Sequence, residues 1–397
     1  MRSSRAFIGL GLLAVSLLSA LAGASCSSFS DEPNIEARDA DLGETGSETS
    51  TGDASLQDGP AIDGEAGVPS CAPRGTTKDL ASPMLQKIYN PPSPTFPFGL
   101  ATDATHVTWA EQSEDVDGGT AYEGVGRGRI LRVAKTGGPA AVIATDQELV
   151  IAVAVAGGFV YWGAGPETAS ELRRRPVGTD CNATFCPAPE SVATFDRRIV
   201  DIRVIRESVF LVMLDNGKVS YVDLATKTSS PLVTTFFYPG LAVTSSHLYA
   251  SSEVTNAALL RATIAPNPVI EVNYLKPAID GGNPGVGRLA TDCRSLFMSH
   301  YTSFVGSKIY AHDFDRPGSF DLVVDTKLNI DQMVADEGNV WVSAANGGLF
   351  AGSRTSTSLV RVFQGNVFRA AVDDDAVYFG DHNPVGTERG TIYRLLK

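Results

Sequence analysis

Residues 153–162 read VAVAGGFVYW: a run of small apolar residues, a turn, then an aliphatic residue followed by aromatic ones. The same phrase recurs seven times between Phe98 and the C-terminus, at intervals of 37 to 53 residues that average 45. A repeat of about 40 to 45 residues with several short strands per unit is typical of a β-propeller with one blade per repeat. The sequence therefore predicts an all-β, seven-bladed β-propeller. The second runs of the seven units are centred on Thr108, Tyr161, Phe210, Tyr249, Phe297, Trp341 and Tyr378.

Each unit opens with the pattern of an innermost strand. The residue seven places before the centre is alanine in five of the seven units. Innermost strands converge on the propeller axis, and large side chains would collide there. A turn follows, and in four units it contains an aspartate that can accept hydrogen bonds from its own turn. These aspartates are Asp103, Asp292, Asp336 and Asp373.

The later strands of each unit indicate stacked blades and a closed ring. The second strand is apolar at consecutive positions, as in residues 160–162, so both of its faces are covered. A third strand follows in every unit and a fourth in six units. The seventh unit ends at Lys397 with no room for a fourth strand, whereas a spare strand-like run, residues 84–89, precedes the first unit. We expect this N-terminal run to form the outermost strand of the last blade, which removes an open edge.

Three segments carry a resemblance to a known class of repeat: FGLATD at 98–103, GRILR at 128–132 and VYW at 160–162. They resemble the YWTD-type and related six- to eight-bladed propeller repeats, although the YWTD signature itself is absent. The resemblance covers roughly residues 84–397. Its motifs are packing motifs shared by propellers of many functions. It therefore implies the fold and, by analogy only, a binding role.

The N-terminus has the features of a bacterial export signal. Arg2 and Arg5 precede an apolar run, residues 7–22, which is too short to favour a membrane-spanning helix. Small residues then lead to Cys26, in a pattern that resembles the lipobox of bacterial lipoproteins. The sequence predicts a signal peptide over residues 1–25 and lipid attachment at Cys26, which would be the only contact with a membrane. Gly23 stands where that pattern usually has Leu, Val or Ile, so an ordinary cleaved signal is the alternative.

Residues 26–80 are predicted to be a disordered acidic linker, with the propeller over residues 81–397. Residues 31–70 carry eleven acids against Arg38, have no aromatic residue, and cannot bury enough apolar surface to fold. Their net charge of −10 accounts for most of the −13 of the whole chain. Residues 1–30 carry +2, which leaves about −5 for residues 71–397. Nucleic acid is disfavoured as a partner, because a protein that binds the phosphate backbone needs a basic stripe.

Four cysteines remain when Cys26 is set aside, and an even number in an exported chain permits two disulfides. Cys181 and Cys186, with four residues between them in a loop of the second unit, are expected to pair. Cys71 and Cys293 form the possible second pair, because the chain between Cys71 and the first strand is long enough to reach. A metal site at the first pair is the alternative, with no neighbouring histidine to support it.

The residues at the entrance of the innermost strands are the candidate ligand-binding residues: Arg203, Arg288, Arg369, Asp201 and Gln332. Three arginines that converge on one axial mouth can hold a carboxylate or phosphate in bidentate fashion. The alternative is a structural role, in which the arginines are satisfied by Asp201 and by backbone carbonyls.

The sequence offers no familiar catalytic motif, so we expect no catalytic residue, no cofactor and no metal. The prediction is an exported, lipid-anchored propeller that serves as a non-catalytic binding or scaffolding module at the bacterial cell envelope. Its partner would be an unidentified protein or a small anionic ligand, and the module would be a monomer. Ser27 follows Cys26, whereas in some bacteria an aspartate there marks the inner membrane, so the outer membrane is preferred. The alternative is a propeller hydrolase or lyase of the sugar-lactone type with its site at the axial mouth.

Overall fold

A computed structural model describes most of the chain from Met84 to the C-terminus, and these residues belong to one compact unit, Pro60–Lys397. The predicted signal peptide, Cys26 and the predicted linker lie outside the described residues. The described residues contain no helix, and therefore none that is long and apolar enough to cross a bilayer. The described residues are 84–92, 95–113, 127–182, 185–206, 209–214, 217–233, 240–251, 259–264, 268–275, 286–302, 306–316, 318, 320–336, 339–344, 347–354, 356–382 and 390–397.

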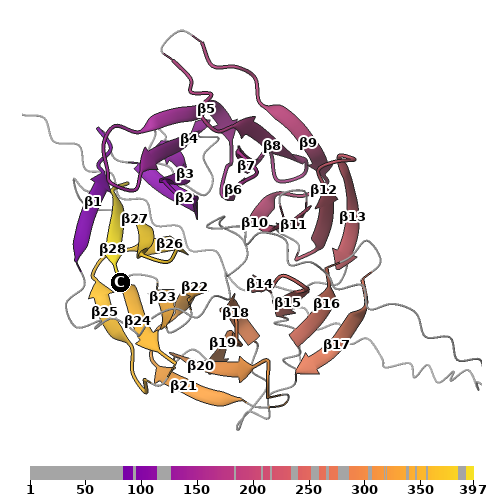
Figure 1. Cartoon of the computed structure of the whole chain (residues 1–397), viewed down its shortest axis with the longest axis vertical. Coiled ribbons are helices and arrows are strands. Elements are labelled where there is room, and N and C mark those ends of the chain that lie inside the picture. The colour runs from indigo at the N-terminus through magenta and orange to yellow at the C-terminus, as the bar shows by residue number, and fades with distance from the viewer. Residues whose placement is uncertain are drawn as a thin grey trace, which may run out of the picture. The chain divides into compact units, whose positions relative to one another are not determined.

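Seven four-stranded antiparallel sheets form a ring, one sheet per blade (Figure 1). The first three blades are β2 (Thr95–Thr102), β3 (His106–Ser113), β4 (Arg127–Ala134), β5 (Ala141–Glu148); β6 (Val153–Ala156), β7 (Phe159–Ala164), β8 (Ser170–Pro176), β9 (Glu190–Phe195); and β10 (Ile199–Arg206), β11 (Val209–Leu214), β12 (Val219–Asp223), β13 (Thr228–Val233). The next three are β14 (Leu241–Val243), β15 (His247–Ser251), β16 (Leu259–Thr263), β17 (Ile270–Leu275); β18 (Val286–Thr291), β19 (Ser295–Thr302), β20 (Gly306–Asp313), β21 (Asp321–Thr326); and β22 (Ile330–Ala335), β23 (Asn339–Ala344), β24 (Gly348–Ser353), β25 (Val360–Phe363). The seventh contains β26 (Val367–Val372), β27 (Ala376–Asp381), β28 (Ile392–Leu396) and β1 (Leu85–Tyr89).

The predicted ring closure is confirmed. The seventh sheet has the order β1-β28-β27-β26, so the N-terminal strand is its outermost strand. Leu85 pairs with Leu395, and the backbone N–H of Leu396 donates to the carbonyl of Met84 at 3.0 Å. Ile88 is buried and packs where the seventh blade meets the first, against residues such as Trp109. The first and last described strands therefore belong to the same blade, and each of the seven sheets has four strands.

The alternation of the inner strands explains why both faces of each blade are apolar. Ala154 of β6 packs with Ile202 of the third blade, whereas its neighbour Val153 packs with Ile130 of the first blade. β6 thus contributes small side chains to its interface, or seam, with the third blade and branched ones to its seam with the first blade. The core is consequently a series of seams between successive blades and has no single centre.

Six blades share one register between their first and second strands, and the third blade differs from them by one residue. In the six blades the residue seven places before the centre lies opposite that centre, as Ala154 lies opposite Tyr161. In the third blade Val204, six places before the centre, lies opposite Phe210. The first pairing after the turn joins residues three places apart in the third blade and five places apart in the first blade, and the extra residue between Val204 and Arg206 offsets only part of this difference.

The turn aspartates behave as expected from the sequence. The carboxylate of Asp103 accepts the backbone N–H groups of Thr105 and His106, each at 2.8 Å. Asp373 makes the same two bonds at 2.9 Å in the seventh blade. These carboxylates therefore fix the turn between the first and second strands of a blade.

Candidate functional site

A β-bulge or similar irregularity recurs near the start of the inner strand in five blades. Bulges turn a side chain away from the regular alternation and are frequent beside functional sites. Arg288 and Arg369 stand within two of these irregular segments, so their direction is set by the irregularity and not by the pleat. The five irregularities lie between Phe98 and Leu100, Ile199 and Asp201, Val286 and Leu289, Ile330 and Gln332, and Val367 and Ala370.

Two of the predicted mouth residues pair with each other. The guanidinium of Arg203 lies 2.8 Å from the carboxylate of Asp201, and its Nε donates to the same oxygen at 3.0 Å. Both side chains are only half-buried. Arg203 thus has a carboxylate partner on its own strand, as the structural alternative requires.

Gln332 uses its side-chain amide to join two blades. Its Oε1 accepts the backbone N–H of Ala370 at 2.6 Å, and its Nε2 donates to the carbonyl of Ala370 at 3.3 Å. The amide thereby completes the backbone hydrogen bonding of β26 from the neighbouring β22. With only 9% of its surface exposed, this side chain has a structural task in addition to its predicted binding role.

Asp331 interacts electrostatically with both Arg288 and Arg369. Burial raises the pKa of the Asp331 carboxyl, and the positive charges of the two arginines act in the opposite direction. The guanidinium of Arg369 also lies over the ring of Phe368, 5.1 Å from its centroid. The negative charge of Asp331, on the inner strand of the sixth blade, is therefore flanked by positive charges on the inner strands of the two neighbouring blades, Arg288 on the fifth and Arg369 on the seventh. Sequence reasoning missed Asp331, although it directly precedes Gln332.

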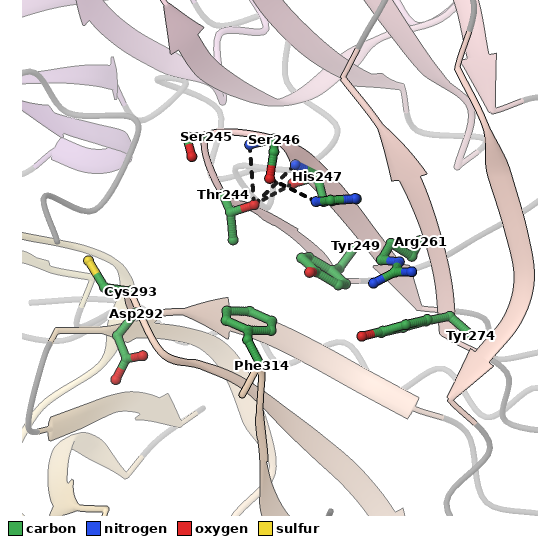
Figure 2. A pocket seen from close by; sticks show the side chains of 10 residues that line it. All are labelled: Thr244, Ser245, Ser246, His247, Tyr249, Arg261, Tyr274, Asp292, Cys293 and Phe314. Carbon is green, nitrogen blue, oxygen red and sulfur yellow. Dashed lines mark hydrogen bonds between the residues drawn. The ribbon is translucent and has the colours of Figure 1, made fainter. Parts of the chain in front are cut away.

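A pocket with a volume of about 280 Å³ lies between the fourth and fifth blades, at the end where the first and second strands turn (Figure 2). Its volume exceeds the roughly 150 Å³ of a cavity that holds benzene. The pocket therefore has room for one ring and a substituent. It is lined by Thr244, Ser245, Ser246, His247, Tyr249, Arg261, Tyr274, Asp292, Cys293 and Phe314.

The walls of the pocket are aromatic and rigidly held. The rings of Tyr249 and Phe314 stack with centroids 5.6 Å apart and an interplanar angle of 22°. Arg261 covers the ring of Tyr274 at 3.9 Å from its centroid and forms a bidentate ion pair with Glu271, with N–O distances of 2.8 and 3.1 Å. The ion pair with Glu271 and the contact with the Tyr274 ring hold the arginine in place. Figure 2 shows Arg261 beside Tyr274.

The protonation states inside the pocket are fixed near neutral pH. Burial, assisted by the charge of Arg261, lowers the pKa of His247 below its usual value, so that its ring is neutral. Burial raises the pKa of Tyr249 to about 12, so that its hydroxyl keeps its proton. Burial also raises the pKa of Asp292, whose carboxylate accepts the backbone N–H groups of Arg294 and Ser295 at 2.8 and 2.6 Å. His247 and Tyr249 can therefore donate or accept hydrogen bonds to a ligand without changing charge.

The contact between Ser246 and His247 is a feature of the turn. The hydroxyl of Ser246 lies 2.8 Å from Nδ1 of the adjacent His247. The same contact occurs at the equivalent turn of the first blade, where Thr105 lies 2.7 Å from Nδ1 of His106. A repeated contact between neighbours in sequence is best explained by turn geometry, and it gives no reason to assign a nucleophile and base to this pocket.

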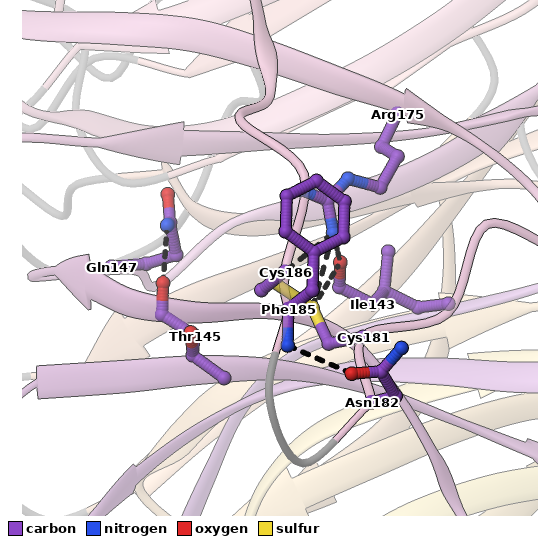
Figure 3. Close-up of a disulfide and its surroundings, with 8 residues drawn as sticks. All are labelled: Ile143, Thr145, Gln147, Arg175, Cys181, Asn182, Phe185 and Cys186. Carbon is purple, nitrogen blue, oxygen red and sulfur yellow. Dashed lines mark hydrogen bonds between the residues drawn. A yellow bond between two sulfur atoms is a disulfide. The ribbon is translucent and has the colours of Figure 1, made fainter.

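The predicted disulfide between Cys181 and Cys186 is confirmed, with their Cα atoms 4.3 Å apart (Figure 3). Cys293 is also disulfide-bonded, and Cys71, its expected partner, lies outside the described residues. Cys293 lines the pocket between the fourth and fifth blades. Across the described ranges, no group of three or more His, Cys, Asp or Glu side chains is placed to hold a metal ion.

The pocket could not be located from sequence spacing. Its lining comes from three strands and two turns and from Phe314, which directly follows β20, so that it joins two blades. Its two tyrosines and phenylalanine follow no common position in the repeat. The only sequence signal is local, since the fourth and fifth units place aromatic residues at the ends of their outer strands.

No protein-family model matches the sequence, and no curated protein sequence matches it. Solved structures match it in fold. The β-propeller domain of the Trilobed protease from Pyrococcus furiosus is 10% identical with a TM-score of 0.53, over 76% of this chain and 93% of that chain. YCF48 from Cyanidioschyzon merolae is 10% identical with a TM-score of 0.51, over 79% and 98% of the two chains. A chain of the Mitotic Checkpoint Complex is 10% identical with a TM-score of 0.50, over 83% and 100%.

These likenesses confirm the propeller fold and nothing more specific. At about one identical residue in ten, packing is shared while the residues of a site are not. The protease propeller is described as having an open velcro topology, whereas here β1 pairs with β28 in the seventh blade.

Proposed function

We propose that this protein is an exported, lipid-anchored propeller that acts as a non-catalytic binding module at the cell envelope of a bacterium, with the outer membrane preferred. The apolar run that ends in small residues at Cys26 supports the anchor, and the acidic segment that follows supports a solvated tether. The described chain starts at β1, on the outer rim of the ring.

The observation that carries the binding role is the pocket between the fourth and fifth blades. It combines aromatic walls with a few polar groups, which is the usual composition of small-molecule sites. His247 is neutral, Tyr249 is protonated, and Arg261 is held by Glu271, so the pocket offers fixed hydrogen-bonding groups. The ligand class that fits is a single ring bearing hydrogen-bonding groups, attached to a small molecule or to a protein.

Ring-sized probes test the pocket. Benzoate, phenyl phosphate and a methyl pyranoside would be titrated into the protein and followed by ligand-observed NMR. The variant Phe314→Ala removes one wall, and Phe320→Ala is the matched control, because both rings pack against the same hydrophobic cluster while only Phe314 lines the pocket. We expect at least one probe to bind and its affinity to fall at least tenfold in Phe314→Ala alone. Equal losses in both variants, or no binding by any probe, would contradict the assignment.

Cell fractionation tests the proposed location at the membrane. Cys26→Ser removes the predicted acylation site and should move the protein from the membrane fraction to the soluble fraction while the propeller still folds. Circular dichroism of the released variant checks the fold. Unchanged partitioning into detergent would refute the lipid anchor and would leave the pocket assignment untouched.

A further inference from the structure

Arg175 lies buried beneath the Cys181–Cys186 disulfide. It belongs to β8, and only 2% of its surface is exposed. Its Nη1 donates to the carbonyl of Ile143 in the first blade and lies 3.2 Å from Sγ of Cys181 and 3.3 Å from Sγ of Cys186 (Figure 3). The guanidinium therefore points directly at the two sulfur atoms.

The charge of Arg175 has no counter-charge in the described part of the protein. No described carboxylate forms an ion pair with it, and no described oxygen accepts from its Nε or Nη2. The two preceding arginines differ: Arg173 pairs with Glu171, and Arg174 pairs with Glu190, each at 2.7 Å. Burial lowers the pKa of Arg175, because a buried charge without a counter-charge is unfavourable.

A disulfide gives this guanidinium only weak acceptors, because neutral sulfur accepts hydrogen bonds poorly. A thiolate would be different. A cationic group beside a cysteine lowers the pKa of its thiol, and a disulfide whose reduced form is stabilised in this way is easier to reduce. We propose that Cys181–Cys186 is a redox-active couple whose reduced form keeps one sulfur as a thiolate paired with Arg175.

The co-reactant is a dithiol reductant. Its thiolate attacks one protein sulfur and forms a mixed disulfide, while the S–S bond breaks and the other protein sulfur leaves as the thiolate beside Arg175. The second thiol of the reductant then loses its proton and attacks the mixed disulfide, which releases the first protein sulfur to take up that proton. The protein gains two electrons, and the reductant becomes a disulfide. A stabilised leaving thiolate also speeds the first step.

The site is open to such a reductant and is held in place when the S–S bond breaks. Both cysteines are half-buried, and Phe185, between them in the loop, is 64% exposed. The backbone N–H of Cys181 donates to the carbonyl of Val142 at 2.7 Å. Asn182 accepts the backbone N–H of Phe185 at 2.7 Å. These bonds do not involve sulfur, so they keep the cysteines near Arg175 after reduction.

Two measurements on the full chain test the proposal. The protein is equilibrated in glutathione redox buffers, and the state of the Cys181–Cys186 peptide is read by alkylation and mass spectrometry. The alkylation rate of the reduced pair is then followed against pH. Asp180 precedes Cys181 and is the charged neighbour in the loop, but it is exposed and therefore screened. Arg175→Met keeps the volume and removes the charge, and Arg174→Met is the matched control on the same strand.

We expect the native protein and Arg174→Met to show a thiol pKa at least one unit below the ordinary 8.5. Arg175→Met should shift the thiol–disulfide equilibrium at least tenfold toward the disulfide, which is about 30 mV for two electrons. A thiol pKa near 8.5 in the native protein would overturn the proposal whether or not Arg175→Met folds. An unchanged equilibrium in a folded Arg175→Met would overturn it as well, and the pair would then be a structural staple.

Discussion

Replacing Ile88 by alanine tests the ring closure at a single side chain. Ile88 is the one fully buried residue of β1, with 4% of its surface exposed. It fills the seam between the seventh and first blades together with Trp109, Leu131 and Tyr378. Ile→Ala in a packed core costs about 2 to 5 kcal/mol, and an outermost strand relaxes more readily than a central one. We therefore expect Ile88→Ala to lower the free energy of unfolding by about 3 kcal/mol.

Leu85→Ala is the matched control, because Leu85 lies in the same strand and is 43% exposed. Its effect should stay within about 0.5 kcal/mol, as for most surface substitutions. Both variants would be unfolded in urea and followed by fluorescence and circular dichroism, whose coincidence checks two-state behaviour. Equal midpoints for the two variants would refute the packing role of β1.

Two truncations extend the same test to the whole strand. Both truncations also remove Cys71, so they are made in a Cys293→Ser background and compared with the full-length Cys293→Ser protein. Removal of residues 1–80 should then leave stability nearly intact, whereas removal of residues 1–92 deletes β1 and exposes the edge of β28. An exposed edge strand invites pairing with other chains. The shorter protein should therefore aggregate, and equal solubility of both truncations, measured by light scattering, would contradict the closure.

Two further predictions concern charged residues. Arg288→Ala with Arg369→Ala should lower the free energy of unfolding by about 1 to 3 kcal/mol, because the half-buried Asp331 then lacks its neighbouring cations. Adding Asp331→Asn should recover part of the loss; unchanged stability together with loss of a phosphate-dependent rise in melting temperature would instead identify an anion site. Arg174 and Lys227 lower the pKa of Glu190 to about 2, so its contribution is present above the usual value of 4.5 and is lost as the pH falls through 2. Glu190→Gln should then cost less than about 1 kcal/mol at pH 7, since the carboxylate is well exposed, and only a small part of that at pH 2, where about half of the carboxyls are protonated; an undiminished difference at pH 2 would show that the ion pair is not its source.

The parts of the fold that depend on periodic packing were predictable from the sequence. Blade stacking is indicated by the alanines of the converging inner strands and by the consecutive apolar residues of the second strands. Ring closure followed from a missing fourth strand and a spare N-terminal run. The shifted register of the third blade was not predictable, because the shorter connection between its first and second strands leaves the apolar pattern almost unchanged.

The sites were less predictable than the fold because they join residues from different blades. The position of Arg203 in the repeat identified it as a residue of the axial mouth. Its position did not decide whether its partner is Asp201, as the structure shows, or a bound ligand. Asp331 acts on arginines from the two flanking blades, a relation that no spacing within one repeat encodes. Arg175 similarly reaches across a seam to Ile143 of the preceding blade.

The position of β1 also determines how the molecule responds to mechanical load. When the expected Cys71–Cys293 disulfide is reduced, a pull transmitted through the N-terminal segment reaches β1 first, at the pairing of Leu85 with Leu395. Because β1 is antiparallel to β28 and is bonded on one side only, such a pull would peel its hydrogen bonds one after another and would not shear them together. The strand that completes the ring is therefore also the first that tension would detach.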